Sequence, residues 1–154
     1  MTHLNVGDTA PDFTLPTDND GEITLSDLRG KKTVLYFYPK DSTPGCTTES
    51  CDFRDAMTDF NDLGAQIIGL SKCSVTKHNN FKAKQNLNFP LASDEHSDVC
   101  ERYGTWKEKS MYGKKFMGIE RTTFLIDENG VIEKIWPKVK VKGHIDEVKA
   151  ALSA

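Results

Sequence analysis

Two cysteines in the stretch PKDSTPGCTTESC are the residues whose type and spacing most directly indicate chemistry. Cys46 follows Thr-Pro-Gly, and Cys51 comes five positions later. Redox pairs of the Cys-x-x-Cys type and zinc knuckles usually leave two residues between their cysteines, whereas four residues separate this pair. The spacing argues against those motifs, so the use of the pair depends on the elements that hold it.

The residues before Cys46 form the strongest predicted strand. Residues 34–38 are continuously apolar or aromatic, which is typical of a strand buried on both faces. After Pro44 and Gly45, residues 46–62 show the spacing of an amphipathic helix. We therefore expect Cys46 in the first helical turn after a buried strand, at the sheet edge where open α/β folds place their sites.

The rest of the pattern predicts one domain, residues 1–154, in which strands and helices alternate. Other strands are expected at 12–16, 23–25, 65–71, 121–127 and 131–137. Helices are expected at 75–86, 97–104 and 145–152, with a short helical turn at 26–30. This order favours a mixed central sheet flanked by helices, and a thioredoxin-like α/β fold with an N-terminal β-hairpin extension satisfies it.

Composition excludes several function classes. Hydrophobic residues make up 37% and charged residues 28% of the 154 positions, as in ordinary globular proteins. The net charge of −3 argues against a nucleic-acid partner, and the lysines of 134–144 are interpreted as the solvated face of a strand. The first residues contain no apolar signal segment, and no apolar run approaches membrane-spanning length. We therefore expect a cytoplasmic protein with no membrane partner.

A cysteine at a helix N-terminus is suited to nucleophilic catalysis. Unpaired backbone N–H groups and the helix dipole both stabilise a thiolate. Ionisation alone is not sufficient, because a less basic thiolate is also less nucleophilic. A dedicated catalyst needs donors aimed at the charge that develops in the transition state. Thr43 could supply a hydroxyl from the same loop, and a distant arginine could supply a fixed cation.

These residues carry a resemblance to a known family. Pro39, Thr43 and Cys46 match the peroxiredoxin active-site pattern Pro-x-x-x-Thr-x-x-Cys. The segments LYFYPK, VCERYGTW and GIERTTFLID resemble sequences of the peroxiredoxin Q (bacterioferritin comigratory protein) subfamily. The likeness runs from GDTAPDFTLP to the final predicted helix.

The resemblance implies a thiol peroxidase acting on hydrogen peroxide and organic hydroperoxides. Cys46 would attack the O–O bond and become a sulfenic acid. Thr43 would hydrogen-bond the peroxide and the thiolate, Pro39 would shield the site from water, and Arg121 would stabilise the thiolate and polarise the peroxide. The implied site residues are Pro39, Thr43, Gly45, Cys46, Glu49, Cys51 and Arg121. Glu49 is expected to orient the arginine.

The position of Cys51 suggests a resolving cysteine. In a regular helix, residues five apart have Cα atoms about 8.6 Å apart, and a disulfide requires less than about 7 Å. Our hypothesis is that residues 46–52 unwind after Cys46 is oxidised, so that Cys51 can form the disulfide. The threonines and serine of CTTESC are mediocre helix formers, which suits such unwinding. Other cysteines or partner thiols remain alternative resolvers.

The expected partners follow from this chemistry. The sequence has no G-x-G-x-x-G motif for a nicotinamide or flavin, so we expect reduction by thioredoxin or a similar dithiol donor. No metal, haem or other cofactor is implied. An intramolecular resolving cysteine favours a monomer, and a weak dimer is the alternative.

Two other function classes are alternatives to a thiol peroxidase. A metal-binding module could use Cys73 with His78 and His96 with Cys100, although both histidines are expected in exposed helix starts. A general dithiol oxidoreductase would require a Cys-x-x-Cys motif, which this sequence does not contain. Cys100 is interpreted as core packing. Cys73 stands where the subfamily usually has aspartate, and its role stays open between a tolerated change and an extra redox thiol.

Overall fold

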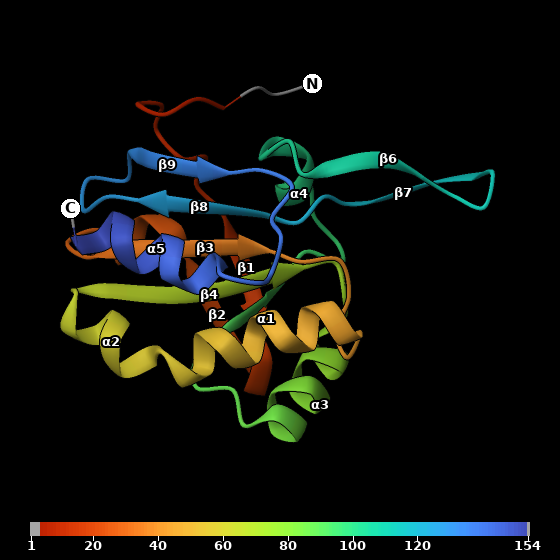
Figure 1. Cartoon of the computed structure of the whole chain (residues 1–154), viewed down its shortest axis with the longest axis horizontal. Coiled ribbons are helices and arrows are strands. Elements are labelled where there is room, and N and C mark those ends of the chain that lie inside the picture. Colours follow the sequence, from red (N-terminus) through yellow and green to blue (C-terminus); the bar gives the residue numbers. More distant parts are fainter. Residues whose placement is uncertain (1–3, 154) are drawn as a thin grey trace.

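The computed structural model describes residues 4–153 and is built around a seven-stranded sheet in the order β2-β1-β5-β4-β3-β8-β9 (Figure 1). Its strands are β1 (Thr14–Thr17), β2 (Gly21–Thr24), β3 (Lys32–Phe37), β4 (Ala65–Ser71), β5 (Leu91–Ser93), β8 (Thr122–Ile126) and β9 (Ile132–Trp136). The β3–β4 and β4–β5 pairs are parallel, and the other neighbours are antiparallel. The predicted mixed sheet with an N-terminal hairpin at its edge is confirmed.

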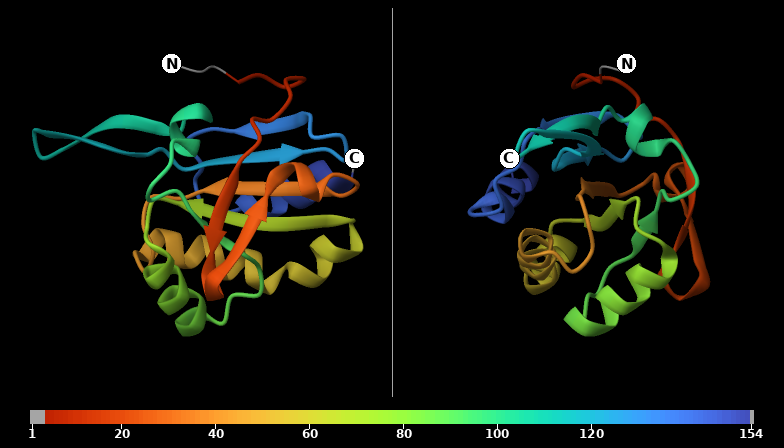
Figure 2. Two further views of the ribbon diagram at one scale, coloured as in Figure 1. Left: turned by 180° about the vertical axis from the view of Figure 1, so that it is seen from behind. Right: turned by 90° about the vertical axis from the view of Figure 1, so that its right-hand side faces the viewer.

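Helices cover both faces of this sheet (Figure 2). They are α1 (Pro44–Asp55), α2 (Met57–Asp62), α3 (Val75–Gln85), α4 (Val99–Arg102) and α5 (His144–Ser153), with short 3-10 turns η1 (Asp18–Asp20) and η2 (Leu25–Leu28). On β3, Val34 and Tyr36 pack in the core cluster that includes side chains of α1, α2, α3 and α5. Leu35 and Phe37 pack with α4 and the N-terminal segment. Because both faces of β3 are buried, its sequence is continuously apolar.

A second, two-stranded sheet projects away from the body of the protein (Figures 1 and 2). It consists of β6 (Trp106–Met111) and β7 (Lys114–Ile119). The sequence did not predict this hairpin, because most of its side chains face solvent and leave no buried alternation. The three-residue strand β5 was also missed, since it is too short for a periodic pattern.

Three predicted boundaries were wrong. The helix expected at 46–62 is two helices, α1 and α2, that meet at Ala56, where ψ is 4°. The helix expected at 97–104 is the single turn α4. The segment 137–142 is not a strand, because β9 ends before Pro137 and Lys138 has a φ of 49°. Within residues 4–153, no helix is long and apolar enough to cross a membrane.

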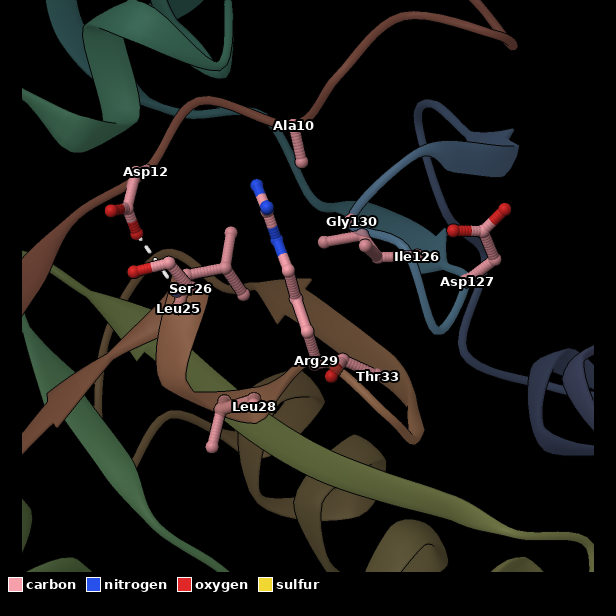
Figure 3. A pocket seen from close by; sticks show the side chains of 10 residues that line it. All are labelled: Ala10, Asp12, Leu25, Ser26, Leu28, Arg29, Thr33, Ile126, Asp127 and Gly130. Carbon is pink, nitrogen blue, oxygen red and sulfur yellow. Dashed lines mark hydrogen bonds between the residues drawn. The ribbon is translucent and has the colours of Figure 1, made fainter.

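The turn between β8 and β9 lies beside a small pocket (Figure 3). The Arg29 side chain extends through this pocket past Gly130, and its guanidinium points towards Ala10. Gly130 has a φ of 82°, which favours glycine, and a Cβ there would lie 2.9 Å from Arg29 Nε, so the arginine side chain would have to shift. The pocket adjoins Thr33 at the start of β3, whereas Cys46 follows the other end of the strand.

Candidate active site

The candidate nucleophile lies where the sequence places it. β3 ends at Phe37, a loop follows, and Cys46 is the third residue of α1. Pro44 begins the helix, which suits proline because the first helical N–H has no intrahelical partner. The Cys46 side chain is completely buried in the core cluster that also contains Tyr36 and Phe53. A buried sulfur at a helix N-terminus lies close to the unpaired N–H groups and away from bulk water.

Arg121, which directly precedes β8, is the cation nearest this sulfur. Its Nη2 donates to Cys46 Sγ at 3.4 Å, and its Nη1 donates to Glu49 Oε1 at 2.7 Å. Burial lowers the pKa of the guanidinium, but Glu49 and Cys46 outweigh burial and raise it above its ordinary value. A Cβ on Gly45 would lie 3.2 Å from Nη2, so this glycine lets the guanidinium approach the helix start. The structure thus brings together Gly45, Cys46, Glu49 and Arg121.

Glu49 is a buried carboxyl within this group. Its side chain is only 1% exposed, and Oε2 has no hydrogen-bond partner among the described residues. Burial raises the pKa of the Glu49 carboxyl from 4.5 to about 7, although Arg121 opposes that rise. Near neutral pH, this carboxyl therefore exchanges between a neutral acid and the anionic partner of Arg121.

Thr43 and Pro39 belong to the loop between β3 and α1. The Thr43 hydroxyl donates to the Lys40 carbonyl at 2.8 Å, within its own loop, and its side chain makes no hydrogen bond to Cys46. The contact expected from the sequence is thus absent between these two described residues. Pro39 lines a groove of about 300 Å³ between the loop and the β6–β7 hairpin, together with Cys73 and Lys109.

The candidate resolving cysteine lies on the same helix. Cys46 and Cys51 are both free thiols within the intact α1. Cys51 is half-buried, and its Sγ donates to Gln85 Oε1 at 3.5 Å. Two residues of the segment between the cysteines are also tied to the body: Glu49 binds Arg121, and Ser50 Oγ lies 2.8 Å from Tyr36 Oη.

The other two cysteines are buried. Cys100 has no exposed surface, as predicted for core packing, and burial, with Asp94 beside it, raises the pKa of its thiol far above the ordinary value. Cys73 is 8% exposed, and its sulfur accepts a hydrogen bond from the backbone N–H of Asp41 at 3.3 Å. Ser74, the next residue, caps α3 by accepting from Lys77 N, so the cap forms without an aspartate at 73.

The expectation of exposed histidines was wrong for His78. His96 is exposed, but His78 is completely buried. It lies three residues before the buried Phe81, on the same face of α3, and this spacing was the available sequence signal. Among residues 4–153, no group of three or more histidine, cysteine or acidic side chains is placed to hold a metal ion.

Comparisons with known proteins agree with this geometry. Residues 6–135 match the model of the AhpC/TSA family. The chain is 56% identical to a protein named putative peroxiredoxin bcp from Coxiella burnetii, over 97% of this chain and 99% of that one. It is 51% identical to peroxiredoxin Bcp from Bacillus subtilis, over 97% and 95% of the two chains.

Solved structures give the same result. Peroxiredoxin Q from Xanthomonas campestris matches with a TM-score of 0.89 and 46% identity, over 99% of this chain and 96% of that one. A peroxiredoxin Q mutant from Xylella fastidiosa matches with a TM-score of 0.93 and 41% identity, over 99% and 98%. Another matching structure, of the X. campestris bacterioferritin comigratory protein, is described by its alkyl peroxide reduction activity. The chain therefore belongs to the AhpC/TSA family, within its peroxiredoxin Q (Bcp) branch, and is a peroxide-reducing enzyme.

Proposed function

We propose that the protein reduces hydrogen peroxide and organic hydroperoxides with Cys46 as the nucleophile and Cys51 as the resolving cysteine. The observation that carries this proposal is the guanidinium of Arg121, which donates to the sulfur of Cys46 at the start of α1. A fixed cation at a helix N-terminus stabilises a thiolate and offers donors to a peroxide oxygen beside it.

In the first step, the thiolate sulfur of Cys46 attacks one peroxide oxygen, and the O–O bond breaks. The sulfur is oxidised to a sulfenic acid that keeps the attacked oxygen and its proton, while the other oxygen takes one proton from the solvent and leaves as water or an alcohol. Negative charge grows on the leaving oxygen, and Arg121 is placed to stabilise it because one donor lies within 3.4 Å of the sulfur. Thr43 is the N-cap of α1, three residues before Cys46, and rotation of its side chain would turn its hydroxyl towards a bound peroxide.

In the second step, the thiol of Cys51 attacks the oxidised sulfur, an S–S bond forms, and water leaves. This step requires α1 to unwind, because cysteines five positions apart in a helix are too far apart to bond. Unwinding must break the Glu49–Arg121 and Ser50–Tyr36 contacts. The break between α1 and α2 supports this step, since it lets the first helix unwind without disturbing the second.

Recycling requires an external dithiol to reduce the Cys46–Cys51 bond. We assign this role to thioredoxin or a similar donor, because the chain has no nucleotide-binding glycine motif that would supply electrons directly. A resolving cysteine in the same chain makes a partner subunit unnecessary, which supports a monomer. The sparse cysteines are typical of a protein of the reducing cytoplasm.

The test is intact mass and non-reducing peptide mapping of reduced protein after one equivalent of hydrogen peroxide. Loss of two hydrogen atoms, mapped to a Cys46–Cys51 bridge, is the expected result. Cys46→Ser should abolish turnover, whereas Cys51→Ser should keep the first oxidation and stall recycling. Unchanged steady-state turnover of Cys51→Ser would refute its role as the resolving cysteine, and a bridge from Cys46 to Cys73 or Cys100 would assign that role to the other cysteine.

A further inference from the structure

A buried polar cluster anchors the loop that leads to Cys46. The Asp41 side chain is 3% exposed and His78 has no exposed surface. Asp41 Oδ1 accepts from the Tyr38 hydroxyl at 2.6 Å, and Asp41 Oδ2 lies 2.6 Å from His78 Nδ1. The other ring nitrogen, Nε2, lies 2.9 Å from the carbonyl oxygen of Ala92. One imidazole thereby joins the loop and α3 to β5.

The backbone of the same loop is held as well. The N–H of Asp41 donates to Cys73 Sγ, and the carbonyl of Cys73 accepts from the Ser93 hydroxyl at 2.6 Å. The N–H of Tyr38 donates to the carbonyl of Leu70 at 3.1 Å. Asp41 is thus tied through its side chain to Tyr38, directly after β3, and to His78 of α3, and through its backbone to Cys73 in the loop after β4.

The residue after Asp41 explains why such anchoring is needed. Ser42 has a φ of 63°, in the left-handed region that a residue with a side chain rarely adopts. Such a conformation persists only where its surroundings enforce it. Ser42 is followed by Thr43, the N-cap of α1, so its conformation sets where the start of that helix lies relative to Arg121.

We propose that Asp41 and His78 are a positioning pair for the peroxide reaction of Cys46. They hold the strained loop so that the start of α1, with Thr43 and Cys46, faces the guanidinium of Arg121, which directly precedes β8. Neither side chain forms a hydrogen bond to the sulfur of Cys46, so the pair would act on the reaction only through the position of the loop. The inference rests on the proposed role of Cys46. A misplacement of about 1 Å between reacting groups can cost about a hundredfold in rate, so loss of the pair should be measurable.

The experiment compares two reactions of Cys46 in the full-length reduced chain. Oxidation by hydrogen peroxide needs the aligned donors, whereas alkylation by iodoacetamide, followed by peptide mass, needs only the thiolate. Asp41→Asn should lower the second-order rate constant with peroxide by about tenfold to a hundredfold, while alkylation changes less than about threefold. His78→Gln should behave alike, and the double variant should be no slower than the slower single variant.

Asp18→Asn is the matched control. Asp18 is also a buried carboxylate that ties α3 to another segment, through Lys82 Nζ at 2.7 Å, but it lies in η1 and not in the loop. Asp18→Asn should lower thermal stability but leave the rates of peroxide oxidation and of alkylation of Cys46 unchanged. If Asp41→Asn fails to fold, Tyr38→Phe provides the same test. It removes the hydroxyl that donates to Asp41, and a smaller decrease in the peroxide rate constant is expected.

The outcomes separate the two proposals. A peroxide rate of Asp41→Asn within twofold of the parent would overturn the positioning role. A sharp rise in the alkylation rate of Cys46 in this variant would also overturn the positioning role, because it would indicate that the core around the cysteine has opened. A parent protein whose Cys46 does not react with peroxide would refute the proposed function instead.

Discussion

The buried carboxyl of Glu49 should make the stability of this protein depend on pH in a way that one substitution isolates. In the folded chain, burial raises the pKa of this carboxyl to about 7, against an ordinary value of 4.5. The folded state therefore holds the proton more tightly than the unfolded state. The stability that the protonated carboxyl contributes is fully present below pH 4.5 and is lost as the pH rises through 7.

The size of the effect follows from the difference between the two pKa values. At about 1.4 kcal/mol per pH unit, it corresponds to about 3 kcal/mol in total, of which about 2 to 3 kcal/mol is lost between about pH 5 and about pH 8. Glu49→Gln replaces the carboxyl with a neutral group of the same shape. Relative to the parent, this variant should gain that amount of stability across the same range.

The assay is urea unfolding of the reduced parent and of Glu49→Gln across this pH range. Taking the difference between the two proteins removes the contributions of all other titrating groups. Glu133→Gln serves as the control, because Glu133 is an exposed partner of Lys32 and such surface pairs contribute about 1 kcal/mol or less. A difference between Glu49→Gln and the parent that stays constant within about 1 kcal/mol would refute the reasoning.

Three further predictions test the site and the packing around it. Arg121→Lys keeps a charge but loses the fork that reaches two partners, so the single-turnover rate of Cys46 with peroxide, followed by tryptophan fluorescence, should fall about a hundredfold; a decrease of less than threefold would contradict this. Phe53→Ala removes a fully buried ring stacked 4.6 Å from its neighbour and should cost about 3 to 5 kcal/mol in urea unfolding; a cost below about 1 kcal/mol would show that the core closes over the gap. Gly130→Ala forces a side chain onto a left-handed residue against Arg29 and should lower stability by about 1 to 3 kcal/mol; an unchanged melting temperature would exclude strain there.

Local sequence determined β3 and α1, the two elements that flank the loop leading to Cys46. The continuous apolar run of β3 predicted a strand buried on both faces, because each face packs against its own layer. Pro44 and the helical spacing after it predicted that Cys46 lies in the first turn of α1. The resemblance on Pro39, Thr43 and Cys46 indicated the family, which the comparisons confirmed.

Other features depended on pairing between distant segments. β5 is a strand because β4 and β1 lie on either side of it, and its three residues carry no period of their own. His78 is surrounded in sequence by polar residues, which suggested exposure, but α3 turns this face towards the loop. Such placements are decided by what packs against a segment rather than by its own composition.

The sequence by itself predicted a candidate nucleophile, the helix that carries it and the family to which the chain belongs, since these depend on neighbouring residues. Tertiary structure alone decided the contact between Arg121 and Cys46, which are 75 positions apart, and between His78 and Asp41, which are 37 apart. It also decided that Thr43 turns its hydroxyl towards Lys40 in this conformation. The physical reason is that a contact across the chain exists only once the whole sheet has fixed the register and orientation of its strands.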